Sequence, residues 1–248
     1  MPQDWFGEEV AAAYDHDEAA VFDPAILDPM LDRLAELADG GSALEFAVGT
    51  GRVALPLAAR GVRVTGIDLS QAMVARLRAK PGGDEAALPV TIGDIATTRV
   101  DGAGSFALVF LVFNTITNLT TQDAQVECFR NAAYHLAPGG VFVVETFIPR
   151  LRWLPPGQRF VPFDVSQPHI GIDEYDVANQ IVISHHTSFR EGTVDRTATP
   201  FRYVWPAELD LMAKLAGMRL VERWADWTRA QFTADSESHV SVWEASRA

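Results

Sequence analysis

A short apolar segment that runs into a glycine-rich turn is the feature that most constrains the fold of this chain. Ala43–Val48 is predicted to be a buried strand, Gly49 and Gly51 follow at once, and the helical pattern of Arg52–Arg60 begins directly after them. Glycine permits the positive φ of a tight turn and lets a ligand approach the backbone closely. The first amides of the following helix are unpaired donors at its partially positive end. The turn is therefore suited to an anion or a carboxylate.

Further apolar segments of strand length alternate with helical patterns along the chain. Strands are expected at 62–67, 88–92, 106–113, 141–147, 219–224 and 239–243, and helices at 8–14, 24–38, 71–80, 121–136 and 207–216. Such alternation predicts βαβ units in a parallel sheet that is covered on both faces. Right-handed crossovers then make the sheet doubly wound, so the predicted fold class is α/β.

The pattern changes at Ile148. Residues 149–168 contain five prolines and no helical period, and segments rich in β-branched and aromatic residues follow at 172–177, 180–189 and 193–203. Glu191-Gly192 between the last two is typical of a hairpin. We therefore expect a single domain over residues 1–248, in which residues 148–204 form an antiparallel cap inserted over the active site.

The bulk composition limits the partners. The single cysteine, Cys128, excludes an internal disulfide and a multi-cysteine metal site, so no metal is expected. A net charge of -13 with only two lysines argues against nucleic acid; it could steer a cationic acceptor or only maintain solubility. No apolar run approaches the roughly 20 residues that span a bilayer, and the acidic N-terminus does not resemble a secretory signal. A cytoplasmic location without a membrane partner is the expectation.

The glycine turn could hold either of two ligands. In the spacing Gly49-x-Gly51-x-x-Ala54 it fits a dinucleotide fingerprint. In the spacing Glu45-x-x-x-Gly49-x-Gly51 it fits S-adenosylmethionine, which has no phosphate but has an α-amino group, a carboxylate and a sulfonium. A carboxylate in the preceding strand matches positive charge only in the second ligand. A strand-to-helix turn without any ligand is the third interpretation.

Two more carboxylates follow the next strands. Asp68 ends the second strand, 17 residues after Gly51, where it could accept two hydrogen bonds from a ribose diol or cap the helix that begins near Ser70. Asp94 follows the third strand, where it could accept from the adenine amine while Ile95 packs on the ring. An aspartate at such a place otherwise forms a turn.

Taken together, these segments resemble the class I S-adenosylmethionine-dependent methyltransferases. The resemblance covers about residues 43–147, and the closing helix and strands at 206–245 are also in family order. It implies a seven-stranded, mostly parallel, Rossmann-like sheet with its last strand antiparallel, and S-adenosylmethionine as cofactor, with S-adenosylhomocysteine as product. The matching residues are Glu45-Phe-Ala-Val-Gly49-Thr-Gly51, Gly66-Ile-Asp68-Leu-Ser70-x-x-Met73, Gly93-Asp94-Ile95 and Leu136-Ala-Pro-Gly-Gly140.

The same resemblance implies where the donor binds. The glycines flank the methionine moiety, the strand-end aspartates take ribose and adenine, and a tyrosine of the N-terminal helix covers the donor. Ala47 stands where the family usually has glycine, and its methyl group is tolerated if φ is negative. The donor-binding residues are then Tyr14, Glu45, Ala47, Gly49, Gly51, Asp68, Leu69, Met73, Asp94, Ile95, Val112 and Phe113.

Catalytic side chains are harder to predict, because methyl transfer from a sulfonium mainly needs alignment of acceptor, methyl carbon and sulfur. A general base adds to this when the acceptor arrives protonated. Glu145, late in the fifth strand, is a candidate base or amine ligand, or else a half-buried strand carboxylate. His185 and His186 point to opposite faces of a strand, so at most one of them faces the pocket, and we name His185 as the candidate base. His135 is expected to be structural.

The acceptor is expected to be a small molecule. The cap is rich in aromatic residues and follows the fifth strand, a position similar to that in small-molecule N- and O-methyltransferases such as the sugar N-methyltransferases. The acidic charge slightly favours a nitrogen acceptor over oxygen. Two other functions stay open: an NAD(P)-dependent oxidoreductase, against which the lack of a Tyr-x-x-x-Lys pair argues, and a catalytically inactive donor-binding partner protein.

Overall fold

A seven-stranded sheet forms the centre of the molecule. The computed structural model describes residues 4–190 and 192–246. The strand order is β10-β11-β5-β4-β1-β2-β3, and β11 pairs antiparallel with both of its neighbours while β1 to β5 pair in parallel. The predicted α/β class and the antiparallel last strand are confirmed. The strands are β1 (Ser42–Phe46), β2 (Arg63–Asp68), β3 (Val90–Ile92), β4 (Phe106–Leu111), β5 (Leu136–Phe147), β10 (Met218–Trp224) and β11 (Ser238–Ala245).

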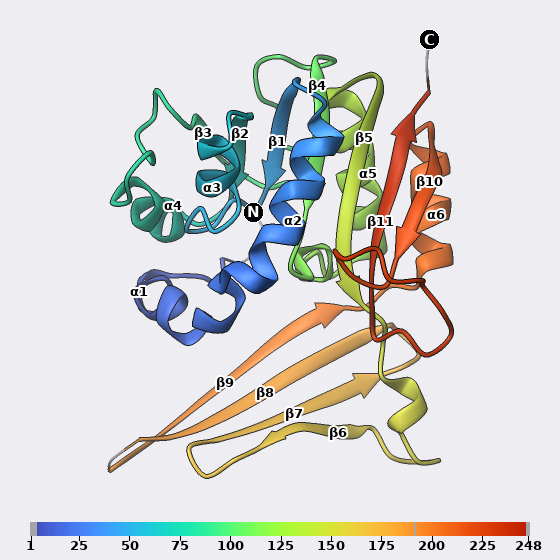
Figure 1. Ribbon diagram of the computed structural model, residues 1–248. Coiled ribbons are helices and arrows are strands. Elements are labelled where there is room, and N and C mark those ends of the chain that lie inside the picture. Colours follow the sequence, from blue (N-terminus) through green and yellow to red (C-terminus); the bar gives the residue numbers. More distant parts are fainter. Residues whose placement is uncertain (1–3, 191, 247–248) are drawn as a thin grey trace.

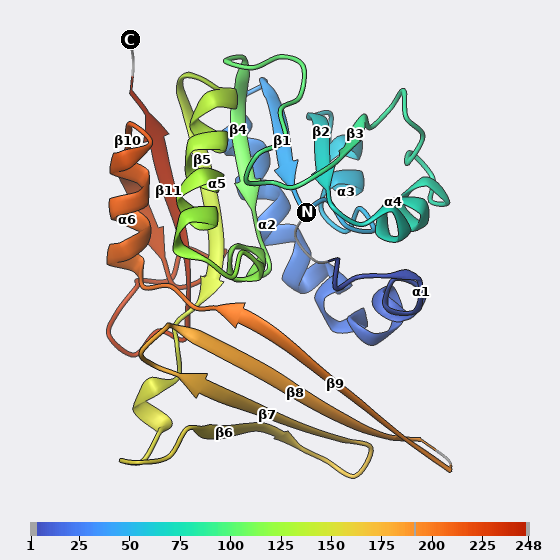
Figure 2. The ribbon, with the colours of Figure 1, turned by 180° about the vertical axis from the view of Figure 1, so that it is seen from behind.

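Helices cover both faces of this sheet. Figure 1 shows α2 (Pro24–Ala38) in front of it, and Figure 2 shows α5 (Gln122–His135) and α6 (Pro206–Leu215) on the opposite face. Each face has its own apolar core, the first built with Leu31 and Leu34 of α2 and the second with Phe129 of α5. The remaining helices are α1 (Glu8–Asp17), η1 (Ala19–Phe22), α3 (Ala54–Ala59), α4 (Gln71–Arg78), η2 (Thr115–Asn118) and η3 (Leu151–Trp153).

A second, antiparallel sheet is inserted between β5 and α6. Its four strands, in the order β6-β7-β8-β9, lie below the end of β5 in Figure 1. Three of them were expected, whereas β6 was missed because it contains Pro162 in a proline-rich stretch. An edge strand tolerates proline, which removes a ladder donor only where no partner needs it. The strands are β6 (Phe160–Val165), β7 (His169–Asp176), β8 (Ile181–Arg190) and β9 (Thr193–Arg202).

Several expected boundaries differ from the structure by two residues or more, and two of the differences have a clear cause. The segment with Pro138 was predicted to separate a helix from a strand, but β5 already begins at Leu136, which pairs with Phe106 before the register shifts. The helix after the glycine turn begins at Ala54 instead of Arg52, because Gly51 at φ +82° extends the turn. Of the predicted hairpin Glu191-Gly192, Glu191 lies outside the described residues.

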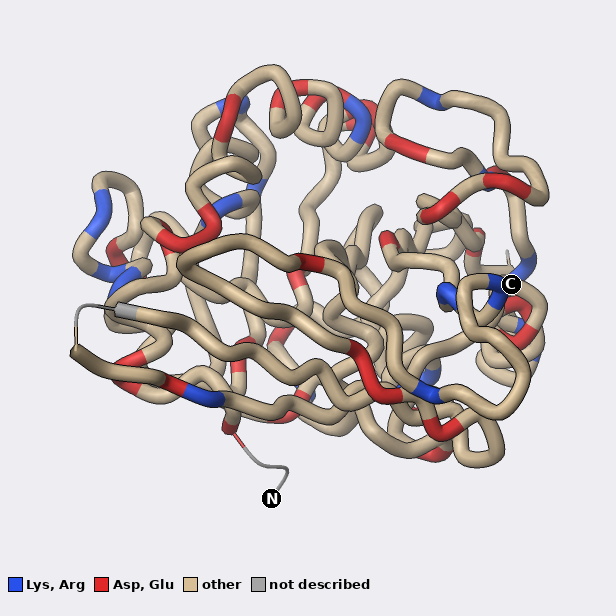
Figure 3. Tube along the Cα trace, turned by 90° about the horizontal axis from the view of Figure 1, so that it is seen from below, with Lys and Arg blue, Asp and Glu red and all other residues tan. Residues whose placement is uncertain are grey.

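Charged positions of both signs are mixed on the side of the molecule that carries the second sheet (Figure 3). In the view from below, Figure 3 shows acidic and basic positions interspersed along the chain, with acidic ones more frequent, over the part that the structure describes. Among the described residues, no helix combines the length and the apolar character that crossing a membrane requires.

Candidate active site

A cavity opens where β1, β2 and β3 end, between these strand ends, the N-terminal segment and η2. It encloses about 760 Å³ of empty space, a volume that includes its open mouth. Eight of the twelve predicted donor-binding residues line it: Tyr14, Ala47, Gly49, Asp68, Leu69, Met73, Asp94 and Ile95. The other lining residues are Asp4, Trp5, Phe6, Ser70, Thr115, Asn118 and Leu119.

The turn after β1 has three residues in left-handed conformations. Gly49 has φ +56° and Gly51 φ +82°, and a Cβ on Gly51 would lie 2.9 Å from Leu55 Cδ1. Gly51 thus lies against α3 and does not line the cavity, while Gly49 does. Ala47 also has a positive φ, +58°, which contradicts the condition under which its methyl group is tolerated. An L-residue in this conformation is strained by roughly 1–2 kcal/mol, which explains why glycine suits the position.

Asp68 connects the ends of two neighbouring strands. Its Oδ2 accepts from the Gly49 amide at 2.6 Å and its Oδ1 from the Ser70 amide at 2.8 Å. Asp68 therefore holds both the glycine turn and the turn that joins β2 to α4. Burial raises the pKa of Asp68 to about 6, although both hydrogen bonds oppose that rise. Each carboxylate oxygen can accept a second hydrogen bond, so capacity for a diol remains.

Asp94 and Ile95 begin the loop after β3. Asp94 Oδ1 accepts from the Ala96 amide at 2.9 Å, and its carbonyl accepts from the Thr97 and Thr98 amides. The aspartate is therefore a turn-former, as the alternative interpretation held, and it also lines the cavity together with Ile95. The two roles are compatible, because the turn fixes where the carboxylate points.

Buried groups of opposite charge flank the glycine turn. Glu45 is 3% exposed, and its Oε2 has no hydrogen-bond partner in the described part of the chain. Burial raises the pKa of Glu45 well above its usual value, against the attraction of Arg52. Arg52 is 8% exposed, its only hydrogen bond in the described chain is a long one of 3.4 Å to the Val21 carbonyl, and its guanidinium lies 4.9 Å from the centre of the Phe113 ring. Both side chains therefore retain hydrogen-bonding capacity that the described part of the chain does not use.

Arg52 was not among the predicted site residues. The sequence did contain a signal for it, because the side chain of an arginine directly after the glycines either points into solvent or is buried beside the turn. Glu45 was predicted, but neither Glu45 nor Arg52 lines the cavity; both are buried behind the turn.

The N-terminal segment closes one side of the cavity. Trp5, Phe6 and Tyr14 line it, and the Ser70 hydroxyl donates to the Phe6 carbonyl at 2.6 Å. Burial raises the pKa of Tyr14 to about 12, so its hydroxyl stays protonated at neutral pH. Of these aromatic residues only Tyr14 was predicted; Trp5 and Phe6 lack a local pattern that separates them from other apolar residues.

Helix α1 is attached to the glycine turn through Asp15. The Thr50 hydroxyl donates to Asp15 Oδ1 at 2.5 Å, and Lys80 Nζ lies 2.5 Å from Asp15 Oδ2. The same lysine donates to the Thr50 carbonyl at 2.8 Å. These contacts join α1, the turn and the end of α4, so the position of Tyr14 over the cavity depends on the turn itself.

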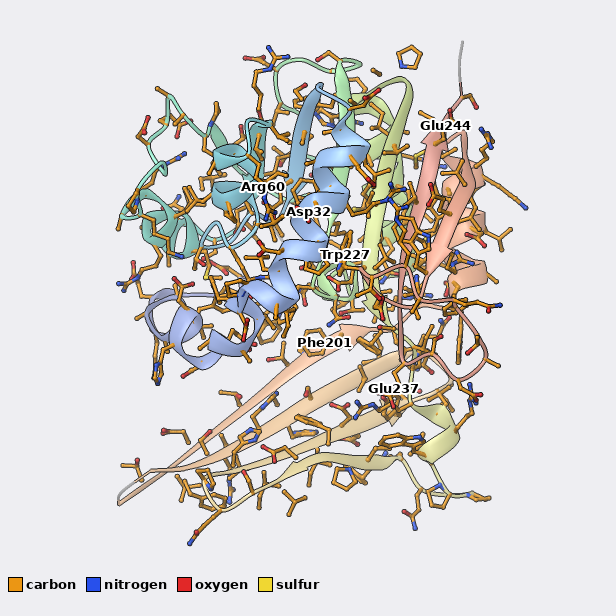
Figure 4. The ribbon with its side chains drawn as sticks, in the orientation of Figure 1. Asp32, Arg60, Phe201, Trp227, Glu237 and Glu244 are labelled. Carbon is orange, nitrogen blue, oxygen red and sulfur yellow. The ribbon has the colours of Figure 1, made fainter. Side chains whose placement is uncertain are left out.

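Glu145 is placed behind the strand ends and does not line the cavity. Its Oε2 accepts from the Phe113 amide at 2.9 Å and its Oε1 from Trp227 Nε1 at 2.8 Å. Figure 4 shows Trp227 in the lower half of the central sheet. Phe113 itself has φ +57°, and neither it nor the buried Val112 lines the cavity. A catalytic role for Glu145 stays a prediction.

The histidines have different surroundings. His185 Nε2 lies 3.1 Å from Glu174 Oε2 on β7, whereas the neighbouring His186 lies 3.0 Å from His169, so the two rings take separate partners. His185 does not line the cavity, and its role as a base stays a prediction. His135 is fully buried at the end of α5. In the described chain, no three His, Cys, Asp or Glu side chains are grouped to hold a metal.

Known proteins resemble the chain along most of its length. A methyltransferase domain model matches residues 43–140. The putative methyltransferase YqeM of Bacillus subtilis (strain 168) is 26% identical over 209 residues, which cover 82% of this chain and 83% of the relative. The S-adenosylmethionine-bound structure of CalS10, an amino pentose methyltransferase from Micromonospora echinaspora, shares the fold with a TM-score of 0.71 at 18% identity over 100% of both chains.

The CcbJ methyltransferase from Streptomyces caelestis is similar in sequence as well as in fold. Its structure is 36% identical with a TM-score of 0.79 and covers 97% of this chain and 98% of its own. Identity at that level along nearly the whole of both chains goes beyond a shared fold, and we conclude that the chain belongs to the class I S-adenosylmethionine-dependent methyltransferase family.

Proposed function

We propose that this methyltransferase acts on a nitrogen or oxygen atom of a small molecule, with an amine favoured. The observation that carries this proposal is the cavity at the strand ends, where the glycine turn and two aspartates meet. No basic tract accompanies it, and the net charge is -13, which favours a cationic acceptor over a polyanion. Family membership argues against the oxidoreductase alternative.

The donor would be held along the strand ends. Asp68 would accept from the ribose hydroxyls, Asp94 from the adenine amine, and Ile95 would pack on the base. Arg52 would pair with the carboxylate of the methionine moiety, while Gly49 lets that moiety approach the backbone. Tyr14 and Phe6 would cover the site from the N-terminal side. When bound, the donor supplies a methyl group that its sulfonium has already activated.

The chain's own residues would then align the acceptor and keep water out. Such positioning can contribute roughly 7–11 kcal/mol to lowering the barrier. The second sheet, which begins directly after β5, would bound the acceptor side, since β9 packs against η2 and η2 contributes Thr115 and Asn118 to the cavity. Glu145 would act by fixing the backbone at Phe113, and His185 stays the candidate proton acceptor. CalS10, which shares this fold, is an amino pentose methyltransferase, which supports an amino sugar as the acceptor class.

Titration calorimetry with S-adenosylhomocysteine, and with NADH as the contrast, tests the donor site. Binding of the first ligand only is expected, and Gly49→Val should abolish it because a β-branched residue fits poorly at φ +56°. Ala59→Val, at an exposed position of α3, is the matched control and should bind normally.

A screen of acceptors then tests the substrate class. We expect donor consumption with amino sugars and little with their deaminated, hydroxylated analogues. Robust methylation of tRNA or protein, with none on metabolites, would overturn the small-molecule proposal. Donor binding without turnover on any acceptor would instead favour a catalytically inactive binding protein.

A further inference from the structure

The loop that begins with Asp94 and Ile95 is held by a buried amide of α5. Asn131 is 0% exposed, and its Nδ2 donates to the Ile95 carbonyl at 2.7 Å and to the Thr98 carbonyl at 2.9 Å. Its Oδ1 accepts from Arg99 NH1 at 2.7 Å. Three polar groups of the loop at residues 95–99 thus converge on one side chain.

His135, one helical turn later, holds the end of the same loop. Its Nε2 lies 3.0 Å from the Val100 amide and its Nδ1 lies 2.8 Å from the Asn131 carbonyl. Because an amide N–H can only donate, Nε2 must accept and Nδ1 must carry the proton. Burial lowers the pKa of His135, which favours this neutral form. The rings of Phe46 and Phe106 pack edge-on against the imidazole and fix its orientation.

The rest of the loop's support is apolar: Ile95 and Ala96 are buried in the core that includes Phe129 of α5, and Val100 packs against it. β3 is three residues long and pairs with β2 alone, and no regular element follows it before β4. Bonds within the loop shape its first turn, around the Asp94 carbonyl, but do not attach it to the body of the protein. The side-chain hydrogen bonds that attach it come from Asn131 and His135, on a helix that does not itself line the cavity.

We propose that Asn131 and His135 are positioning residues for recognition of the donor's nucleobase. They hold the loop at 94–100 so that the Asp94 carboxylate stays at the position of an exocyclic amine and Ile95 stays against the ring. The inference rests on the proposed donor site. It adds that selectivity for the base depends on the rigidity of this loop, which α5 supplies.

The physical reason is that a carboxylate in a fixed position distinguishes a hydrogen-bond donor from a hydrogen-bond acceptor. Adenine presents an amine at the exocyclic position, whereas hypoxanthine presents a carbonyl oxygen whose lone pairs face the carboxylate. A carboxylate that is held in place binds the first and rejects the second. A carboxylate on a loose loop can turn away, so the penalty for hypoxanthine disappears together with the gain for adenine.

The test compares two probes, S-adenosylhomocysteine and S-inosylhomocysteine, by titration calorimetry. The wild-type protein should prefer the adenine probe by about tenfold or more. Asn131→Asp keeps the size and the acceptor for Arg99 but removes both donors to the loop. It should weaken binding of the adenine probe by about tenfold and bring the ratio of the two affinities close to one.

Three further variants distinguish a positioning role from a general loss of stability. Phe129→Leu loosens the packing of α5 without removing a hydrogen bond to the loop, and should lower the melting temperature while keeping the affinity ratio. His135→Gln retains an acceptor for the Val100 amide and should recover most of the ratio that His135→Leu loses. Arg99→Ala, at an exposed position, covers the case in which Asn131→Asp does not fold, and should reduce the ratio by about two- to threefold.

An unchanged ratio in Asn131→Asp, or in Arg99→Ala if the former is unfolded, overturns the inference. So does a ratio that falls equally in Phe129→Leu. A wild-type protein that binds both probes equally overturns the nucleobase role but leaves donor binding in place. A wild-type protein that binds neither probe refutes the proposed donor site itself.

Discussion

The donor cavity and the four-stranded sheet are held in place by different means. Around the cavity, side chains such as Asp68 bind main-chain amides at the ends of neighbouring strands, and the loop after β3 is held in addition by α5. The four-stranded sheet instead depends on side-chain contacts between elements far apart in sequence. Substitutions in the two regions should therefore act mainly on different properties: donor affinity in the first, and the stability of the sheet's attachment in the second.

Arg202 at the end of β9 is the main polar attachment of that sheet. It is 5% exposed and its guanidinium donates to Gln125 Oε1 on α5 at 2.5 Å and to Glu208 Oε1 on α6 at 2.6 Å. It also donates to Gln180 Oε1 at 3.1 Å. In return, Gln125 Nε2 donates to the Arg202 carbonyl and to the Ile116 carbonyl of η2, both at 3.1 Å. One network thus joins the second sheet, two helices and an element of the cavity.

Arg202→Leu should have the largest effect. It removes the ion-pair partner of Glu208 and a donor to Gln125, while Glu208 keeps its hydrogen bonds from Gln122 and Gln180. Breaking a buried ion pair destabilises a protein by about 3–5 kcal/mol, and this half-buried pair should lie near the lower end. Chemical denaturation measures the loss. Arg196→Leu, at an exposed position of the same strand, should change the free energy of unfolding by less than about 0.5 kcal/mol. Equal effects of the two substitutions would show that the network does not hold the sheet.

Asp68→Ala acts on the donor cavity. It should weaken binding of S-adenosylhomocysteine by about 1–3 kcal/mol, from the loss of hydrogen bonds to a charged group. Asp84→Ala is the control, because Asp84 accepts from the Ala87 amide in a surface loop away from the cavity. Calorimetry that finds unchanged affinity in Asp68→Ala would refute the ribose assignment.

How far the sequence predicts each region follows from the same difference. Hydrophobic periodicity and turn residues are local, so the seven strands, the helix from Pro24 to Ala38 with its Asp23 cap, and the strand-end positions of Asp68 and Asp94 could be predicted. Trp5 and Phe6 reach the cavity only through tertiary packing, which leaves no local signal. The edge strand β6 was not predicted, because a proline such as Pro162 normally argues against a strand.

The pH dependence of donor binding sharpens the assignment of Asp68. Its pKa is raised from 3.8 to about 6 in the folded protein, so ionisation of Asp68 lowers the stability of the free protein as the pH rises from 3.8 to about 6 and by a constant amount above that. Ribose hydroxyls that donate to the ionised carboxylate would offset this cost. Affinity should therefore be constant above pH 6 and fall below it, by at most about tenfold per pH unit. Asp68→Asn should remove this dependence. A dependence that persists in that variant would assign the titration to another group.

Ala47→Gly should have the smallest effect, and it is a gain. Glycine at φ +58° relieves left-handed strain, while the greater freedom of the unfolded chain offsets part of this, so the net stabilisation should be about 1 kcal/mol or less. The melting temperature should then rise by about 2–4 °C for each kcal/mol gained. Ala43→Gly, in the buried middle of β1, should lower it instead. Because the cavity is built from main-chain turns, donor affinity should stay within about twofold in Ala47→Gly. A loss of affinity would mean that the alanine methyl group itself contacts the donor.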